Sequence, residues 1–394
     1  MALALWRTIN MGPHGEVVDD DILTMRILNF PILVYENILK HLKPSELLLL
    51  SFCSLRTRAL VSRMRHTPTY TVFVLNRPEE MNYALVNEPE KEEIVITWNW
   101  NNEKMGGVRT ERIKSKYIDL ECRITFKKNS NTPILWCSFE NQSSRKRFAT
   151  ALHSHMCEVF RVEPEMQFKL SLDYMNELPY TNTVRDVTLL DTTVNSRIVD
   201  EFFEKFHVTR ALFSKSYKRN NPLKDSCKFH QINNLFIDCS SWIDGSYLLK
   251  FDCQNLVAIV PSVRENSLIK FVNQWLEGKY TKLRTMAVLL DTDVDAPIVL
   301  NQFSLAPWNA EEDKINYDLP VHDYCKRLFK ELNDMDRSGV LRRQSDGLRA
   351  VMRGKLGQFL FHKPMDEPFR DIPSYPLDES LFQMDQLPEQ CILP

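Results

Sequence analysis

The stretch FPILVYENILKHLKPSELLLLSFCSLRTRAL, residues Phe30–Leu60, predicts a helical hairpin with more apolar surface than it can bury by itself. Pro31 and Pro44 suit first-turn positions, where the fixed φ is favourable and no N–H is needed, so two helices separated near Lys43 are expected. Leu47–Leu50 place four leucines about 100° apart and surround the second helix with hydrocarbon. The first helix carries an apolar stripe at helical spacing, formed by Val34, Ile38 and Leu42.

A unit of this size buries too small a fraction of its surface to be stable alone. We therefore expect one stripe to pack inward and another to remain for a partner. The alternative is that the hairpin packs only against its own chain.

The spacing of the hairpin resembles the F-box. That family has a Leu-Pro pair, then Ile-Leu, a further Leu, Asp/Glu-Leu-Leu, and a small or aliphatic residue before a basic stretch. The matching positions here are Phe30-Pro31, Ile38-Leu39, Leu42, Glu46-Leu47-Leu48 and Cys53, followed by Arg56 and Arg58. Phe30 replaces the Leu, and Thr57 stands where many F-boxes carry an aromatic residue.

The resemblance implies that the hairpin docks on the Skp adaptor of a cullin-RING ubiquitin ligase. The residues to which it assigns adaptor binding are Pro31, Ile38, Leu39, Leu42, Pro44, Leu47, Leu48 and Cys53.

Composition limits the classes of function. A chain of 394 residues with 43% hydrophobic residues can hold two or three domains with sizeable cores. The formal charge of −2 gives no broad basic footprint for nucleic acid or an anionic membrane. Nine cysteines without C-x-x-C indicate reduced thiols in the cytoplasm or the nucleus. No apolar stretch approaches the ~18 residues of a membrane span, and we expect no signal peptide.

After the hairpin the periodicity changes to that of strands. Apolar and polar residues alternate over 118–126, and similar strands are expected at 69–75, 94–100 and 134–139. A helix is expected from Ser143 to Phe160, with a buried stripe of Phe148, Leu152, Met156 and Val159. This region predicts an antiparallel patch covered by a helix.

From about Thr183 onward, short apolar strands alternate with amphipathic helices. Strands are expected at 187–190, 256–260 and 284–290, with helices at 196–206 and 266–278. This order implies parallel strands joined by right-handed crossovers, as a doubly wound sheet or a leucine-rich-repeat-like curve. We favour the curve, because the sequence after Leu189 is echoed after Leu289 as LLDTTV against LLDTDV.

The segment Leu268–Leu283 resembles a signature of the nematode-type (type 2) F-box-associated domain. A downstream pattern of that family matches Arg343, Asp346-Gly347 and Ala350. Tyr280-Thr281 departs from the Asn-Pro that the family commonly has after the glycine.

The predicted fold class combines α+β with α/β. A small all-helical F-box is followed by a mixed region with an antiparallel patch and a repeat-like run of strand–helix units. The expected boundaries are a flexible segment 1–24, the F-box 25–66, the mixed region 67–180, the F-box-associated region 181–361 and a Pro-rich tail 362–394.

We expect neither an active site, a metal nor a cofactor. His153, His155 and Cys157 are interpreted as a helix with surface histidines, because residues two apart point to different helix faces. Cys227 with His230 has no complementary ligand pair. Asp291, Asp293 and Asp295 resemble the start of a calcium-binding loop, but the residues that follow depart from the pattern of such a loop. The sequence contains no glycine-rich phosphate loop and no triad motif.

The leading functional hypothesis is a non-catalytic substrate receptor of a cullin-RING ligase. The F-box would bind the adaptor, and the C-terminal domain would bind an unknown target protein. Trp242 is a candidate anchor for the target, while a core position is favoured for Trp275. The alternative is a scaffold or sequestering protein that uses the same hairpin outside a ligase. A third class, an enzyme, predicts a polar pocket with a base and a nucleophile in reach.

Overall fold

The structure is a computed structural model, and it describes residues 31–64, 70–77, 79–88, 91–100, 110–114, 116–126, 132–161, 166–191, 193–214, 218–219, 223–237, 243–291, 293–309 and 338–363. The chain divides into two compact units. Unit 1 holds residues 1–169 and 174–181, and unit 2 holds 170–173 and 182–394. The predicted flexible segment 1–24, the predicted tail beyond residue 363, and Trp242 lie outside the described residues.

Unit 1 contains the predicted hairpin and a mixed sheet. Its helices are α2 (Ile32–Lys40), α3 (Pro44–Cys53), α4 (Leu55–Arg63) and α5 (Gln142–Phe160). Its strands are β1 (Tyr70–Arg77), β2 (Glu80–Glu88), β3 (Lys91–Asn99), β4 (Glu111–Lys114), β5 (Asp119–Phe126), β6 (Pro133–Cys137) and β7 (Met166–Leu170). A 3-10 segment, η3 (Leu172–Glu177), follows β7.

The strands of unit 1 lie in the order β7-β1-β2-β3-β6-β5-β4. Most neighbours are antiparallel as predicted, but β3 and β6 run parallel, so the patch is a mixed sheet. Helix α5 has the predicted buried stripe. Phe148 of that stripe meets the ring of Trp98 edge to face at 5.6 Å, which anchors the helix on the sheet.

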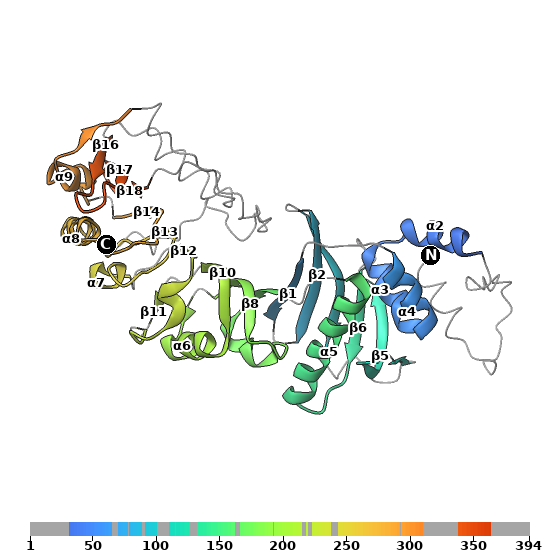
Figure 1. Cartoon of the computed structure of the whole chain (residues 1–394). Helices are drawn as coiled ribbons and strands as arrows, with labels where there is room; N and C mark the ends of the chain where they lie inside the picture. The colour runs from blue at the N-terminus through green and yellow to red at the C-terminus, as the bar shows by residue number, and fades with distance from the viewer. Residues whose placement is uncertain are drawn as a thin grey trace. The chain divides into compact units, whose positions relative to one another are not determined.

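Unit 2 is built from strand–helix steps. Five parallel strands are β8 (Thr183–Leu189), β10 (His207–Ser214), β12 (Asn234–Ile237), β13 (Asn255–Ile259) and β14 (Thr285–Leu289). They lie side by side in chain order and never reverse, so they lack the order of a doubly wound sheet. The segments between and after them include α6 (Ser196–Lys205), η4 (Lys228–Gln231), α7 (Gly245–Leu248), α8 (Glu265–Leu276) and α9 (Ala296–Asn301). Helices α6 to α9 lie along one face of the strands (Figure 1).

Antiparallel strands complete the far edge of unit 2. β14 is followed in space by β18 (Gln358–His362), β17 (Arg349–Lys355), β16 (Ser338–Arg342) and β15 (Ala306–Pro307). A separate two-stranded sheet pairs β9 (Thr193–Val194) with β11 (Lys218–Arg219).

Side chains of successive steps contact one another at a regular sequence interval. Arg210 pairs through both guanidinium nitrogens with Asp186, each bond 2.8 Å long, and Asn234 donates to the carbonyl of Arg210, with both partners 24 residues away. Tyr247 donates to the carbonyl of Leu223 over the same interval. Bonds over this interval therefore connect neighbouring steps, as in stacked repeats.

Candidate functional site

Helix α2 leaves apolar side chains in solvent. Leu33 is 75% exposed and Val34 is 43% exposed. Tyr35 and Leu39, four residues apart and therefore on one face, are buried and attach the helix to unit 1. Pro31 precedes the helix, and its carbonyl accepts from the amide of Val34 at 2.9 Å. The helix thus exposes two neighbouring apolar side chains in its first turn.

Helix α3 is buried on nearly all sides, as its leucines predict. Leu47 and Leu48 are fully buried, and Leu49 and Leu50 are almost so. The cover comes from this chain itself, because α3 contacts β3, β4 and α5. The apolar surface of the second helix is therefore the part of the hairpin that packs inward. The sheet that follows in sequence supplies the missing cover.

Helix α4 begins at a reciprocal cap. The amide of Thr57 donates to the hydroxyl of Ser54, and the amide of Ser54 donates to the hydroxyl of Thr57, both at 3.0 Å. Thr57, where the F-box pattern often has an aromatic residue, is thus a buried capping residue. Next to the cap, Leu55 is 70% exposed and adds to the apolar surface of the helices.

A polar contact attaches the hairpin to α5. The hydroxyl of Ser51 donates to the carbonyl of Leu48 at 2.6 Å and lies 2.8 Å from Nε2 of His155, so Nε2–H donates to Ser51. The ring of Phe52 stacks on the imidazole at 4.6 Å. Burial, with the charge of Arg58 as a second cause, lowers the pKa of His155 to about 4. His155 is therefore a neutral structural group at physiological pH.

The interpretation of His153 and His155 as surface residues is wrong, because both are buried. His153 faces a different partner, as expected for helix residues two apart, and its Nδ1 lies 3.0 Å from the hydroxyl of Tyr83. The sequence pattern missed these roles because both partners are far away in the chain. Cys157 lies beside His153, with 3.5 Å between Sγ and Nε2.

The residues to which the sequence assigned adaptor binding fall into two groups. Leu39, Leu47 and Leu48 are buried in unit 1. Pro31 is exposed, and Ile38, Leu42, Pro44 and Cys53 are half-buried. Burial raises the pKa of the Cys53 thiol to about 12, which makes it a poor nucleophile.

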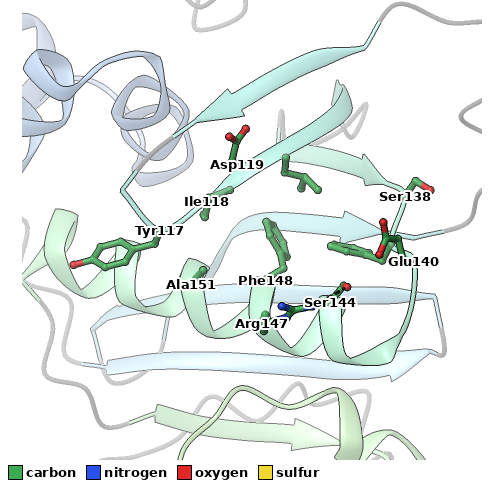
Figure 2. Close-up of a pocket in the computed structure, with 11 residues that line it drawn as sticks. Tyr117, Ile118, Asp119, Ser138, Glu140, Ser144, Arg147, Phe148 and Ala151 are labelled. Carbon is green, nitrogen blue, oxygen red and sulfur yellow. Dashed lines mark hydrogen bonds between the residues drawn. The ribbon is translucent and has the colours of Figure 1, made fainter.

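A cavity of about 440 Å³ lies between α5 and the beginning of β5 (Figure 2). It is lined by Tyr117, Ile118, Asp119, Leu120, Ser138, Phe139, Glu140, Ser144, Arg147, Phe148 and Ala151. Asn141 caps α5, since its Oδ1 accepts from the amide of Ser144 at 2.9 Å. Arg112 holds Asp119 through two bonds of 2.7 and 3.0 Å. The lining holds no histidine or cysteine.

The motif Arg343, Asp346-Gly347 forms a clasp in unit 2. The guanidinium of Arg343 bonds both carboxylate oxygens of Asp346, donates to the carbonyl of Trp275 at 3.1 Å, and lies 4.9 Å from the centre of its ring. Gly347 has φ 74°, a conformation that favours glycine. Trp275 is 1% exposed, in agreement with the expected core position. These residues join the turn after β16 to the end of α8.

The other candidate ligand residues have local partners. Nδ1 of His230 lies 3.0 Å from the carbonyl oxygen of Cys227. Arg264 pairs with Asp293 at 2.7 Å and with Asp291 at 3.7 Å. Within the described ranges, no group of three or more potential metal ligands comes together.

Comparison with known proteins identifies an F-box domain at residues 27–68. This confirms the predicted F-box, whose described part is the helical group α2 to α4. F-box domains bind the Skp adaptor within cullin-RING ubiquitin ligases, and proteins that carry them are generally non-catalytic adaptors. No curated protein and no solved structure matches the chain. None of the helices in the described ranges has the length and apolar character needed to span a membrane.

Proposed function

We propose that this chain is a substrate receptor of a cullin-RING ubiquitin ligase, with unit 1 binding the Skp adaptor and unit 2 binding a target protein. The observation that carries the proposal is an F-box domain whose first helix keeps Leu33 and Val34 exposed. A side chain such as Leu33 gains about 2 kcal/mol on full burial, so solvent exposure of two neighbouring apolar residues favours a partner.

In this proposal the adaptor contacts the accessible part of the predicted set. Its members are Pro31, Ile38, Leu42, Pro44 and Cys53, and the exposed Leu33, Val34 and Leu55 join them. The buried Leu39, Leu47 and Leu48 act indirectly, because they hold the outer helix face in place.

Unit 2 is the proposed target-binding part, as a leucine-rich-repeat-like domain of the F-box-associated type 2 class. Support comes from its strands in chain order, its helices along one face, and the clasp of Arg343 and Asp346 at the positions of the type 2 pattern. Ubiquitin transfer would be performed by the RING subunit and the conjugating enzyme, while this chain raises the local concentration of target lysines. The cytoplasm or the nucleus is the proposed compartment.

Calorimetry with the purified Skp adaptor tests the adaptor surface. We expect Leu33→Lys to weaken binding at least tenfold, because a charge replaces an apolar contact. Ile298→Lys, on the exposed side of α9, is the matched control and leaves binding unchanged. Thermal melts must first show that both variants fold. Equal binding by the wild-type chain and Leu33→Lys would contradict the proposed surface.

Reconstitution with the cullin, the RING subunit and a conjugating enzyme tests the ligase role. We expect ubiquitin transfer to a protein captured by unit 2. Adaptor binding without any such transfer would favour the scaffold hypothesis.

A further inference from the structure

The cavity of unit 1 combines apolar walls with charged groups at its rim. The rings of Phe139 and Phe148 lie 5.4 Å apart on its wall, and Ile118 and Leu120 line it from the beginning of β5 (Figure 2). The contact with Trp98 holds Phe148 in place, so this wall exists before any ligand arrives. The volume of about 440 Å³ falls within the roughly 300–1,000 Å³ of ligand pockets. The cavity can therefore hold a bulky side chain of another molecule.

Arg147 supplies a positive charge to the lining. Its Nη2 donates to the hydroxyl of Ser144 at 3.4 Å, a long bond, and no carboxylate in the described ranges pairs with it. Arg145, two residues earlier, differs because it pairs with Glu177 at 3.1 Å. A guanidinium can bind a carboxylate through two hydrogen bonds. Arg147 is therefore available for an acidic group of a ligand.

The lining also contains two carboxylates, and they differ in their partners. Asp119 is held by Arg112 through the two bonds described above, so its charge is compensated. Glu140 is exposed and pairs with no cation in the described part of the chain. Glu140 precedes Arg147 by seven positions, which is ~10 Å along a helix axis at about 1.5 Å per residue. The cavity thus has a negative and a positive charge at different places on its rim (Figure 2).

The separation of these charges indicates the class of ligand. The charged groups of a single amino acid or a small organic acid are too close together to contact both residues. In an extended peptide, alternate side chains point the same way and lie ~7 Å apart, at about 3.4 Å per residue. Three alternate side chains can then present an acid, an apolar group and a base to one surface. The flexible Arg147 and Glu140 side chains can adjust to this spacing.

We propose that the cavity binds an extended peptide segment of a partner protein, in which an acidic, a bulky apolar and a basic residue occupy alternate positions. Arg147 contacts the acidic residue, the apolar walls enclose the bulky side chain, and Glu140 contacts the basic residue. The proposed function assigns the target to unit 2, so this site goes beyond it. Peptide binding here requires neither the adaptor nor unit 2.

Fluorescence anisotropy of the full chain with labelled peptides tests the site. The peptides are Gly-Asp-Gly-Phe-Gly-Lys-Gly and the reverse order, so that both chain directions are covered. We expect one of them to bind, and we expect replacement of its phenylalanine by alanine to weaken binding at least tenfold. Arg147→Glu should weaken binding about tenfold, because an attraction becomes a repulsion.

Arg197→Glu is the matched control and should leave binding unchanged. Arg197 is an exposed arginine in the first turn of α6, and Asn195 caps that helix as Asn141 caps α5. In the Arg147→Glu variant, a peptide with lysine in place of its aspartate should bind more tightly than the original peptide. This reversal separates a direct contact from a loss of folding, which thermal melts also monitor.

Other results would overturn the proposal. Absence of binding by both peptides, or equal binding of the phenylalanine and alanine peptides, would show that the cavity takes no such segment. Equal weakening in Arg147→Glu and Arg197→Glu would identify a general charge effect. Competition by phenylpropionate at the peptide's own concentration would identify a small acid as the ligand. None of these outcomes depends on adaptor binding, so they are separable from failure of the ligase proposal.

Discussion

Nε2 of His155 lies 2.8 Å from the hydroxyl oxygen of Ser51, and this contact joins helix α5 to helix α3 across 104 residues of sequence. Phe52 stacks on the same ring, and Arg58 pairs with Glu158 one turn further along α5 at 3.6 Å. The F-box helices therefore share a core with the sheet of unit 1.

Ser51→Ala removes the acceptor of the Nε2–H bond and leaves that donor buried without a partner. We expect a loss of about 1–2 kcal/mol in the free energy of unfolding, measured by urea denaturation. Ser62→Ala is the control, because the Ser62 hydroxyl donates to the carbonyl of Arg58 within helix α4 and ties no other element. An equal loss of unfolding free energy in both variants would mean that the contact between Ser51 and His155 does not contribute to stability.

Acid is expected to destabilise the fold through His155 and His362, whose pKa values are both lowered to about 4, in each case mainly by burial. Between pH 6.5 and 4 the unfolded chain binds protons that the folded chain excludes, so stability falls as the pH falls through this window. The free energy of unfolding falls by about 1.4 kcal/mol per pH unit for each histidine, which is about 2 kcal/mol for each at pH 5.

His155→Gln tests the direction of this pH dependence, because a glutamine side chain cannot take up the proton. The decrease in unfolding free energy from pH 7 to pH 5 should become about 2 kcal/mol smaller than in the wild-type chain. His41→Gln, at an exposed position, is the matched control substitution. A wild-type chain that gains stability on acidification over this range would refute the assignment.

Leu47→Ala and Leu33→Ala separate packing from binding. Leu47 is fully buried, so its truncation is expected to cost 2–5 kcal/mol of stability, about the range for leucine cavities. Leu33 is 75% exposed, so its truncation should change stability by less than about 0.5 kcal/mol while weakening adaptor binding. Thermal denaturation and calorimetry on the same preparations measure the two effects.

Arg343→Lys is expected to loosen the clasp in unit 2. A lysine cannot reproduce the two-bond contact with Asp346 or the stacking on Trp275, and we expect a loss of about 2 kcal/mol. Arg342→Lys, at the exposed neighbouring position, is the control with less than about 0.5 kcal/mol. Chemical denaturation followed by tryptophan fluorescence measures the free energy of unfolding of both variants. Equal values for the two variants would exclude an energetic role for the clasp.

Local sequence signals were sufficient for many elements. Pro31 and Pro44 marked the starts of two helices, and the stripe beginning at Phe148 gave α5 to within a residue at its N-terminus. Alternation of strands with helices anticipated the parallel order of unit 2. These signals depend on near neighbours in the chain, so they can be interpreted without knowledge of the tertiary structure.

Signals that depend on distant residues were missed. Strand β2 was not expected, because its sequence lacks a clean alternation of apolar and polar residues. The neighbouring residues Tyr83 and Ala84 are both fully buried in the structure. The leucines of α3 were identified as apolar, but their sequence could not show that β3 and β4 would cover them. The apolar side chains of the hairpin that stay exposed are Leu33, Val34 and Leu55.

The regular contacts between steps of unit 2 have an evolutionary consequence. Because Arg210 reaches back to Asp186 and Asn234 reaches back to Arg210, each step is bonded mainly to its immediate neighbours. A step can then be inserted, deleted or altered while the remainder keeps its register, as in other linear arrays. Such a chain can acquire a new binding specificity by changing its length, without redesigning its core.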